Sequence, residues 1–240
     1  MAHRKGEKEA LRRQREERQA RAQAEQQRKR LVGYGGAAAL VLAAVVVVLL
    51  LAGGGGNGGG VQGEGNFFHE GGEAAAQKVF DLEDAARGAG CKLSSSKGSG
   101  VATHTQSLSE RVNYKDNPPT TGRHFQIPAE DGIYNGQPPQ DEELVHDLEH
   151  GRVVIWVKPS VAEDARATIR AMYDEDEGFQ TLLVQRKNMP YAVAATAWNR
   201  DPQPGGTGRT LGCDKWTPEV LDALRAFRDE HRSNGPEPVP

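Results

Sequence analysis

The chain is poor in residue types and motifs that mark several familiar chemistries. Its 240 residues include only three methionines, Met1, Met172 and Met189, so the sequence does not support a methionine-rich copper(I) site. It contains no Gly-rich phosphate-binding loop, no Gly-x-Ser-x-Gly nucleophile motif and no dinucleotide-binding fingerprint. The sequence therefore gives no indication of a nucleotide-dependent enzyme or a serine hydrolase.

Positive charge is scarce beyond the first thirty residues. Those residues contain eleven Lys or Arg and five Glu, whereas the rest of the chain contains nineteen basic and twenty-eight acidic residues. The net charge is therefore +6 before Leu31 and −9 from Leu31 onward, which gives −3 for the whole chain. Because phosphate backbones bind concentrated positive charge, we expect no nucleic-acid partner for the main part of the protein.

Charge is absent altogether between Leu31 and Val61, and the segment Leu31–Ala52 is almost wholly apolar. As a helix, this segment would span about 33 Å, enough for a hydrocarbon core of about 30 Å. It lacks the polar face of a helix that packs on a soluble core. The sequence therefore predicts a transmembrane helix at residues 31–52. A cleaved signal peptide is the alternative, but its apolar region is shorter and follows a shorter N-terminal segment.

The residues that flank this segment predict its orientation. Arg28, Lys29 and Arg30 precede it, and a neutral Gly-rich stretch follows it. Positive charge stays on the cytoplasmic side, so we expect a single-pass signal anchor in the lipid bilayer of the cell membrane, with its C-terminal domain extracytoplasmic. We interpret residues 1–30 as a basic cytoplasmic tail that mainly sets topology. The alternative is a helix that lies on anionic lipid headgroups.

The remainder of the chain predicts an α+β domain. We expect a Gly-rich linker at residues 53–72, the folded domain at 73–232 and a disordered tail at 233–240. Helices are predicted at residues 73–88, 141–150, 161–173 and 218–231, and strands at 152–158, 181–185 and 192–198. Ser160 and Thr217 are the expected N-caps of the last two helices. The core order β-α-β-β-α predicts a small sheet with helices packed on one face.

The two cysteines, Cys91 and Cys213, both lie on the expected oxidising side of the membrane. We predict a disulfide between them, because thiols pair in such compartments. Closing a loop of about 120 residues would stabilise the fold by roughly 4 to 5 kcal/mol in the chain-entropy model. The alternative is two separate free thiols.

Histidines are concentrated in the middle of this domain, where His104, His124, His146 and His150 lie. His146 and His150 are four residues apart on a predicted helix, so both rings project from one face and can bind one metal ion. A histidine in the last turn of a helix is also favoured by the helix dipole, which accounts for His150 without a metal. A metal-binding site and a metal-free arrangement are therefore both consistent with the pattern.

The loop before His124 predicts rigid placement of that ring. Pro118 and Pro119 each fix one backbone angle, and Gly122 permits an unusual one. Rigid placement of an imidazole matters for metal geometry. Four further side chains are candidates to complete the ligand set or to orient the rings, namely Tyr114, Glu142, Glu143 and Glu149.

Residues 146–150 also match His-x-x-Glu-His, the pattern of inverted zincin metalloproteases. There, two histidines bind zinc and the glutamate activates water. The motif is short enough to arise by chance, the predicted helix ends at Gly151 just after it, and such proteases are much larger. A small metallohydrolase is therefore the third hypothesis for this domain.

Two stretches of sequence resemble a known family. These are Asn117-Pro-Pro-Thr-Thr-Gly122 with His124, and Leu148-Glu-His-Gly151, together with Tyr114, Gly132-Ile-Tyr134, Glu143 and Val145-His146. They are similar to the signature of the domain of unknown function numbered 3105, over roughly residues 78–232. The usual loop of that family reads Pro-Pro-Thr-Ser-Gly-Pro-His, so Thr121 and Arg123 depart from it. The resemblance implies an actinobacterial, membrane-anchored protein and marks the four histidines as residues to test.

The leading hypothesis is a membrane-anchored extracytoplasmic domain that binds a divalent metal through histidines. The predicted ligands are His104, His124, His146, His150 and Glu149, and imidazole suits either copper(II) or zinc. No catalytic residue is assigned, and we lean against an enzyme. The alternative is a metal-free structural or interaction module of the cell envelope.

Overall fold

The computed structural model describes residues 66–237 of the chain. The predicted cytoplasmic tail, transmembrane helix and most of the linker lie outside the described residues, as do residues 238–240. None of the helices within residues 66–237 combines the length and the apolar character needed to cross a bilayer.

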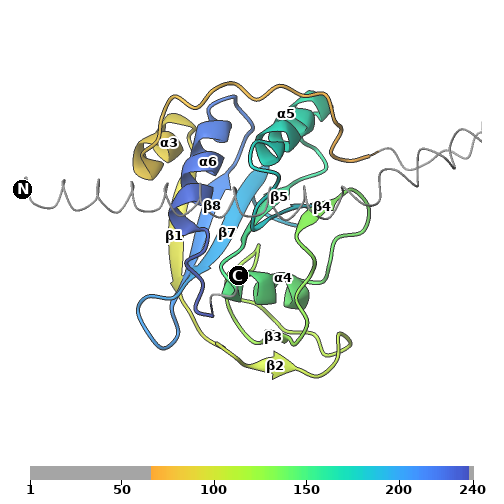
Figure 1. The fold of residues 1–240 in the computed structure, drawn as a ribbon, viewed down its shortest axis with the longest axis vertical. Coiled ribbons are helices and arrows are strands. Elements are labelled where there is room, and N and C mark those ends of the chain that lie inside the picture. The colour runs from red at the N-terminus through yellow and green to blue at the C-terminus, as the bar shows by residue number, and fades with distance from the viewer. Residues whose placement is uncertain (1–65, 238–240) are drawn as a thin grey trace, which may run out of the picture. The chain divides into compact units, whose positions relative to one another are not determined.

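A six-stranded mixed sheet forms the centre of the described domain (Figure 1). Its strands, in spatial order, are β1 (Lys92–Lys97), β8 (Thr207–Cys213), β7 (Val193–Asn199), β5 (Val153–Val157), β6 (Thr181–Gln185) and β4 (Gly132–Tyr134). Neighbouring strands from β1 to β5 are antiparallel, whereas β5, β6 and β4 are parallel. Two further strands, β2 (His104–Thr105) and β3 (His124–Phe125), form a separate parallel pair.

Within residues 66–237, four helices accompany the sheet, namely α3 (Leu82–Gly88), α4 (Asp141–Glu149), α5 (Glu163–Asp174) and α6 (Val220–His231). The parallel strands β5 and β6 are connected through α5, as a crossover between parallel strands requires. The α+β class predicted from the sequence is confirmed, although the structure contains more strands than the sequence predicted.

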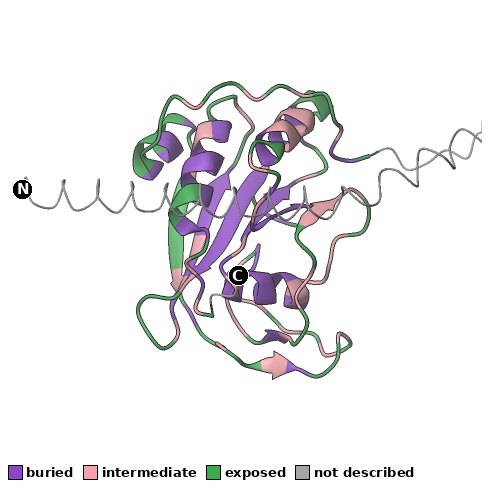
Figure 2. Cartoon of the chain, viewed as in Figure 1, coloured by how far each residue is buried: buried purple, intermediate pink, exposed green. Residues whose placement is uncertain are grey.

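The central strand β5 shows how the sheet is covered. All five of its residues are buried, as the purple strands of Figure 2 illustrate. Val153, Ile155 and Val157 pack in one apolar cluster with α3, α5 and α6, whereas Val154 and Trp156 pack in a second cluster with α4. Successive strand residues point to opposite faces, so both faces of the sheet are covered. The prediction of helices on one face is therefore wrong for α4.

Several predicted elements agree closely with the structure. The prediction for β6 matches residue for residue, and those for β5, β7 and α4 are correct to within one residue at each end. The caps were less well predicted. Ala162 and Glu219 precede the first residues of α5 and α6, in place of Ser160 and Thr217. Both helices therefore begin two residues later than the sequence suggested.

The helix predicted at residues 73–88 is reduced to α3. Asp81 caps its start, because its side chain accepts a hydrogen bond from the backbone N–H of Asp84 at 3.1 Å. Upstream, the backbone N–H groups of Lys78 and Val79 both donate to Asp222 on α6, each at 3.1 Å. These N–H groups are bonded to another element, and the helix begins only after them.

Cys91 and Cys213 form a disulfide in the structure, with their sulfur atoms 2.05 Å apart. Cys91 immediately precedes β1, and Cys213 is the last residue of β8. Since β1 and β8 are paired, with Lys92 opposite Gly212, the bond joins chain segments that the sheet already holds together.

Both ends of the described region pack on the domain. Phe68 is fully buried, and its backbone N–H donates to the side-chain oxygen of Asn135 at 2.8 Å. At the other end, Ser233 donates its backbone N–H to the carbonyl of Gly151, and Glu237 donates to the carbonyl of Glu149. Residues 66–72 and 233–237, which the sequence assigned to linker and tail, thus include contacts with the folded domain.

Candidate metal centre

Two histidines are brought together by the short strands β2 and β3. These strands pair in parallel with His104 directly opposite His124, and the ring centres of the two histidines are 4.8 Å apart. His124 is completely buried and His104 is half-buried. The backbone N–H of His124 also donates to the carbonyl of Thr103 at 3.1 Å, which ties the two strands together beside the site.

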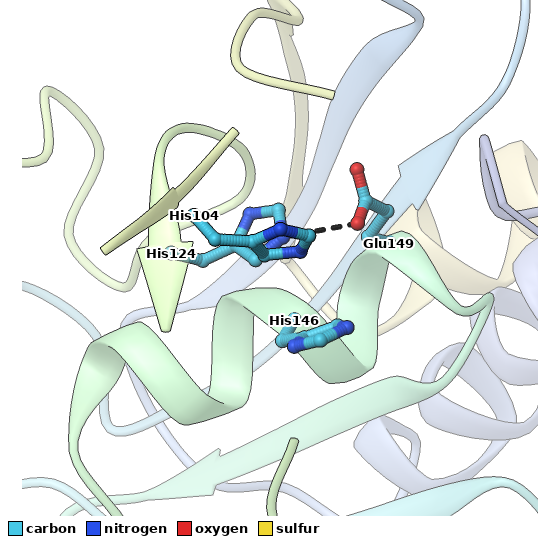
Figure 3. A group of neighbouring side chains, drawn as sticks. All are labelled: His104, His124, His146 and Glu149. Carbon is cyan, nitrogen blue, oxygen red and sulfur yellow. Dashed lines mark ion pairs between the residues drawn. The ribbon is translucent and has the colours of Figure 1, made fainter. Parts of the chain in front are cut away.

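The other two members of the cluster come from α4. This helix has three acidic residues in its first turn and a capping box formed by Gln140 and Glu143. Its apolar residues Leu144 and Leu148 pack on the sheet. His146 and Glu149 are three residues apart, which places them on one face of a helix. They meet His104 and His124 between α4 and the two short strands (Figure 3).

The backbone fixes the orientation of two of the imidazole rings. Nδ1 of His124 lies 2.8 Å from the carbonyl oxygen of Gly122, and Nδ1 of His146 lies 2.7 Å from that of Phe125. A carbonyl oxygen only accepts, so in each ring Nδ1 carries the proton and donates it. When such a ring carries no second proton, it holds a lone pair on Nε2. Histidines that bind metals are oriented in this way by a hydrogen bond from the other nitrogen.

Three atoms of the cluster are buried without a hydrogen-bond partner among the described residues. They are Nε2 of His104, Nε2 of His124 and Oε2 of Glu149. The last two are only 3.0 Å apart, within ion-pair distance, but they do not meet the geometry of a hydrogen bond. A buried polar group without a partner costs roughly 1 to 3 kcal/mol, so three in one place require an explanation.

The spacing of the side chains suits a single metal ion. One ligand atom from each of His104, His124, His146 and Glu149 lies within 4.8 Å of all the others. The three ring centres are separated by 4.8 to 5.1 Å. Imidazole nitrogens that bind one tetrahedral ion at about 2.0–2.1 Å place their ring centres about 5 Å apart. The spacing of the three rings therefore matches that of three imidazoles bound to one such ion.

Glu149 supplies the negative charge of the cluster and anchors the loop in front of it. Its Oε1 accepts a hydrogen bond from the backbone N–H of Ala102 at 2.6 Å. Ala102 has a φ angle of 52°, which is unusual for a residue other than glycine. Burial raises the pKa of Glu149, but His124 and the Ala102 N–H outweigh it and lower the pKa below its ordinary value. Glu149 is therefore an anionic ligand candidate at neutral pH.

His146 is held in the neutral form that a metal ligand requires. Its pKa is lowered to about 4, chiefly because burial disfavours the charged ring, although the hydrogen bond with the Phe125 carbonyl opposes this shift. Above that pH no proton has to leave this ring before a metal binds. Burial also lowers the pKa of His150, with a further contribution from Arg152.

His150 lies beside this group without being one of its four members. It is the C-cap residue of α4, and its Nε2 lies 3.1 Å from Nε2 of His146. A second group is formed by Glu149, His150 and Glu237, whose ligand atoms are also within 4.8 Å of one another. His150 was predicted from the sequence as a ligand together with the four members of the first group. Sequence reasoning missed Glu237, which lies in the predicted disordered tail.

The additional carboxylates proposed from the sequence lie elsewhere. Glu142 accepts a hydrogen bond from the backbone N–H of Val112 at 2.7 Å and pairs with Arg111 at 3.3 Å. Glu143 belongs to the capping box of α4. These two side chains fasten the start of the helix to the chain around it and do not belong to the histidine cluster.

Tyr114 supports the loop that carries His124. Its hydroxyl donates to the carbonyl of Arg123 at 2.7 Å, and burial raises the pKa of this hydroxyl. Gly122 has a φ angle of 136°, and a Cβ atom there would lie 3.0 Å from the Tyr114 ring. The aromatic ring thus explains why glycine stands at this position.

Arg123 gives the loop a second connection. Its Nε and one terminal nitrogen lie 3.3 Å from the carbonyl oxygen of His104, and its other terminal nitrogen pairs with Glu110. This arginine stands where the resemblance led us to expect proline. It links the strand of His124 to the strand of His104 through hydrogen bonds that proline has no group to make.

Comparison with known proteins gives the family of the chain. A family described as a protein of unknown function, DUF3105, matches residues 104–239. The chain belongs to this family. The match begins at His104 and includes all four members of the histidine cluster, in agreement with the resemblance seen in the sequence. No curated protein and no solved structure matches the chain.

Proposed function

We propose that this domain binds one divalent transition-metal ion, zinc or copper(II), through His104, His124, His146 and Glu149. One observation carries the proposal: three of these side chains each have a buried nitrogen or oxygen atom without a hydrogen-bond partner, and ligand atoms of all four lie within 4.8 Å of one another. A cation would partner all three atoms at once when each of the two ring nitrogens holds a lone pair there. Three imidazoles and one carboxylate suit zinc and copper(II) rather than magnesium or calcium, which prefer oxygen ligands.

A metal-free structural module is the alternative, and the contact between His124 and Glu149 favours it. If His124 carried a proton on both nitrogens, its ring would form a buried ion pair with the carboxylate at 3.0 Å. That arrangement would satisfy two of the three unpartnered atoms. It leaves Nε2 of His104 without a partner, which is why we prefer the metal.

The arrangement supports a zincin-like hydrolase less well. That mechanism needs His146 and His150 on the metal and the intervening glutamate free to activate water. Here Glu149 belongs to the group of potential ligands, and its Oε1 already accepts the Ala102 N–H. His150 lies outside the group of four. We therefore propose metal binding and assign no reaction to the domain.

Metal titration of the full chain, purified in detergent and stripped with a chelator, tests the proposal. We expect tight binding of zinc or copper(II) that is lost in His124→Ala and strongly weakened in Glu149→Gln, with circular dichroism unchanged. His69→Ala is the matched control, because His69 is partly exposed and pairs with Glu163 away from the cluster. Equal binding by the parent and His124→Ala, or no binding by a folded parent, would contradict the proposal.

We further propose that the domain is anchored to the outer face of the cell membrane by residues 31–52. The uncharged apolar run and the basic residues before it support this topology. The Cys91–Cys213 disulfide supports an oxidising location for the domain. Protease added to intact spheroplasts should digest the domain and leave a short membrane-bound fragment. Full protection of the domain until the cells are lysed would contradict this orientation.

A further inference from the structure

The second group of ligand atoms, at the C-terminal end of α4, extends the proposed metal centre. Glu149 is common to both groups, and His150 and Glu237 complete the second one. We propose that the domain binds a second divalent metal ion through His150 and Glu237, with the Glu149 carboxylate bridging the two ions. This inference rests on the proposed function, because the bridging carboxylate belongs to the first site.

The position of Glu237 is fixed by the backbone. Its N–H donates to the carbonyl oxygen of Glu149 at 3.1 Å, and two residues earlier Gly235 packs against the same carbonyl. A Cβ atom on Gly235 would lie 2.2 Å from that oxygen, so only glycine allows this close approach. Glu149 thus contributes its side chain to the first site and its carbonyl to the segment that carries Glu237.

Gly151, which follows the end of α4, also allows the C-terminal segment to approach closely. Gly151 has a φ angle of 82°, and a Cβ atom there would lie 2.9 Å from the backbone nitrogen of Gly235. Ser233 donates its N–H to the Gly151 carbonyl at 2.8 Å. The C-terminal segment is therefore fitted to the end of α4, where His150 is the cap residue.

The two imidazoles of α4 connect the sites. Because Nδ1 of His146 donates to Phe125, its Nε2 is an acceptor, and Nε2 of His150 lies 3.1 Å from it. Without metals, a proton on His150 occupies the space between them. With two metals, each nitrogen binds its own ion, and a shared carboxylate holds such ions about 3.5–4 Å apart.

Charge and exposure distinguish the two sites. The first site is buried and has one carboxylate, whereas Glu237 is exposed and places the second site at the surface. Arg152 is the nearby positive group, and its side chain pairs with Asp131 at 3.3 Å. Glu237 adds a negative charge that offsets the second ion. The second site has fewer protein ligands, so we expect it to bind more weakly and to keep water in its remaining positions.

Copper(II) loading of the full chain, followed by metal analysis and electron paramagnetic resonance, tests the second site. We expect two ions per chain and a signal weakened by coupling through the bridging carboxylate. Glu237→Gln, a change at an exposed position, should leave one ion per chain and restore the full signal of an isolated copper(II) ion. His150→Ala should do the same, and His69→Ala should behave as the parent does.

The possible outcomes separate this inference from the proposed function. One ion per chain in the parent, unchanged in Glu237→Gln, overturns the second site and leaves the first intact. Two uncoupled ions whose number does not depend on Glu237 also overturn it. No bound ion in a folded parent means that the proposed function itself has failed.

Discussion

The two faces of the central sheet are covered in different ways. On one face, α3, α5 and α6 bury a large apolar cluster, and the buried arginines of α6 have acidic partners, Glu175 for Arg225 and Asp176 for Arg228. On the other face, α4 packs a smaller apolar cluster on the sheet and carries His146 and Glu149 toward β2 and β3. There, buried nitrogen and oxygen atoms of His104, His124 and Glu149 lie together without a hydrogen-bond partner.

The difference supports our proposal that the α4 face is the one that binds a metal ion. Opposite charges that pair in a protein interior compensate part of the cost of burying each other. Lone pairs that face one another do not, and such an arrangement is stable only if a cation enters or a proton is retained.

The largest effect is expected from the three-helix face. Phe227 on α6 is fully buried in the apolar cluster. Phe227→Ala should lower the free energy of unfolding by about 3 to 5 kcal/mol, because the cavity loses both burial and packing. Urea unfolding with chelator present measures the change. The stoichiometry of metal binding at a temperature where the variant is folded should equal that of the parent, and a loss of metal binding there would mean that the two faces are coupled.

The second-largest effect on stability is expected from metal binding at the α4 face. A free metal concentration of about 100 times the dissociation constant should stabilise the parent by about 2.7 kcal/mol, because only the folded chain holds the four ligands together. Urea unfolding with and without zinc measures this difference. In Glu149→Gln most of the stabilisation should disappear, whereas Phe227→Ala should retain it. Equal stabilisation of parent and Glu149→Gln would show that the metal binds elsewhere.

A pH effect should appear beside the cluster, at Asp147. Burial, with a contribution from Asp131, raises the pKa of this carboxyl from 3.8 to about 8. Below about pH 4 both folded and unfolded chains hold the proton. Between pH 4 and 8 the unfolded chain releases it while the folded chain keeps it, so stability falls as the pH rises. Asp147→Asn should raise the Tm at pH 8 and leave it unchanged near pH 4.

The matched control for that measurement is Asp214→Asn. Asp214 is exposed and pairs with Lys92 at 3.3 Å, an interaction of little energetic consequence. Thermal unfolding followed by circular dichroism from pH 4 to 8, with chelator present, compares the two variants. A parallel fall in Tm for the parent and Asp147→Asn would contradict a protonated Asp147 in the folded state.

The smallest effect is expected at the loop that carries His124. Tyr114→Phe removes the hydroxyl that donates to the Arg123 carbonyl and keeps the ring that packs against Gly122. We expect a loss of about 1 kcal/mol of stability, the usual value of one such hydrogen bond. Metal affinity should weaken by less than in Glu149→Gln. Calorimetric titration of Tyr114→Phe and Glu149→Gln with zinc measures both affinities. A larger loss of affinity in Tyr114→Phe than in Glu149→Gln would contradict this prediction.

Local sequence patterns predicted the elements whose residues carry strong signals. The five apolar residues of β5 and the acidic start of α4 identified those elements to within one residue. In contrast, β1 and β8 escaped prediction, because Lys92–Lys97 has no apolar alternation and Thr207–Cys213 contains two glycines. Gly208 is explained only by the fold, since a Cβ atom there would lie 2.3 Å from the hydroxyl of Thr120.

The sequence by itself determined which residue types were available for a metal and placed His146 and Glu149 on one helix, because helical spacing is a local property. It also supported the pairing of the two cysteines. Only the tertiary structure decided that His104 and His124 lie opposite each other, that Glu149 holds Ala102, and that Glu237 returns to the end of α4. These contacts join residues far apart in the chain, and they depend on packing that no local pattern contains.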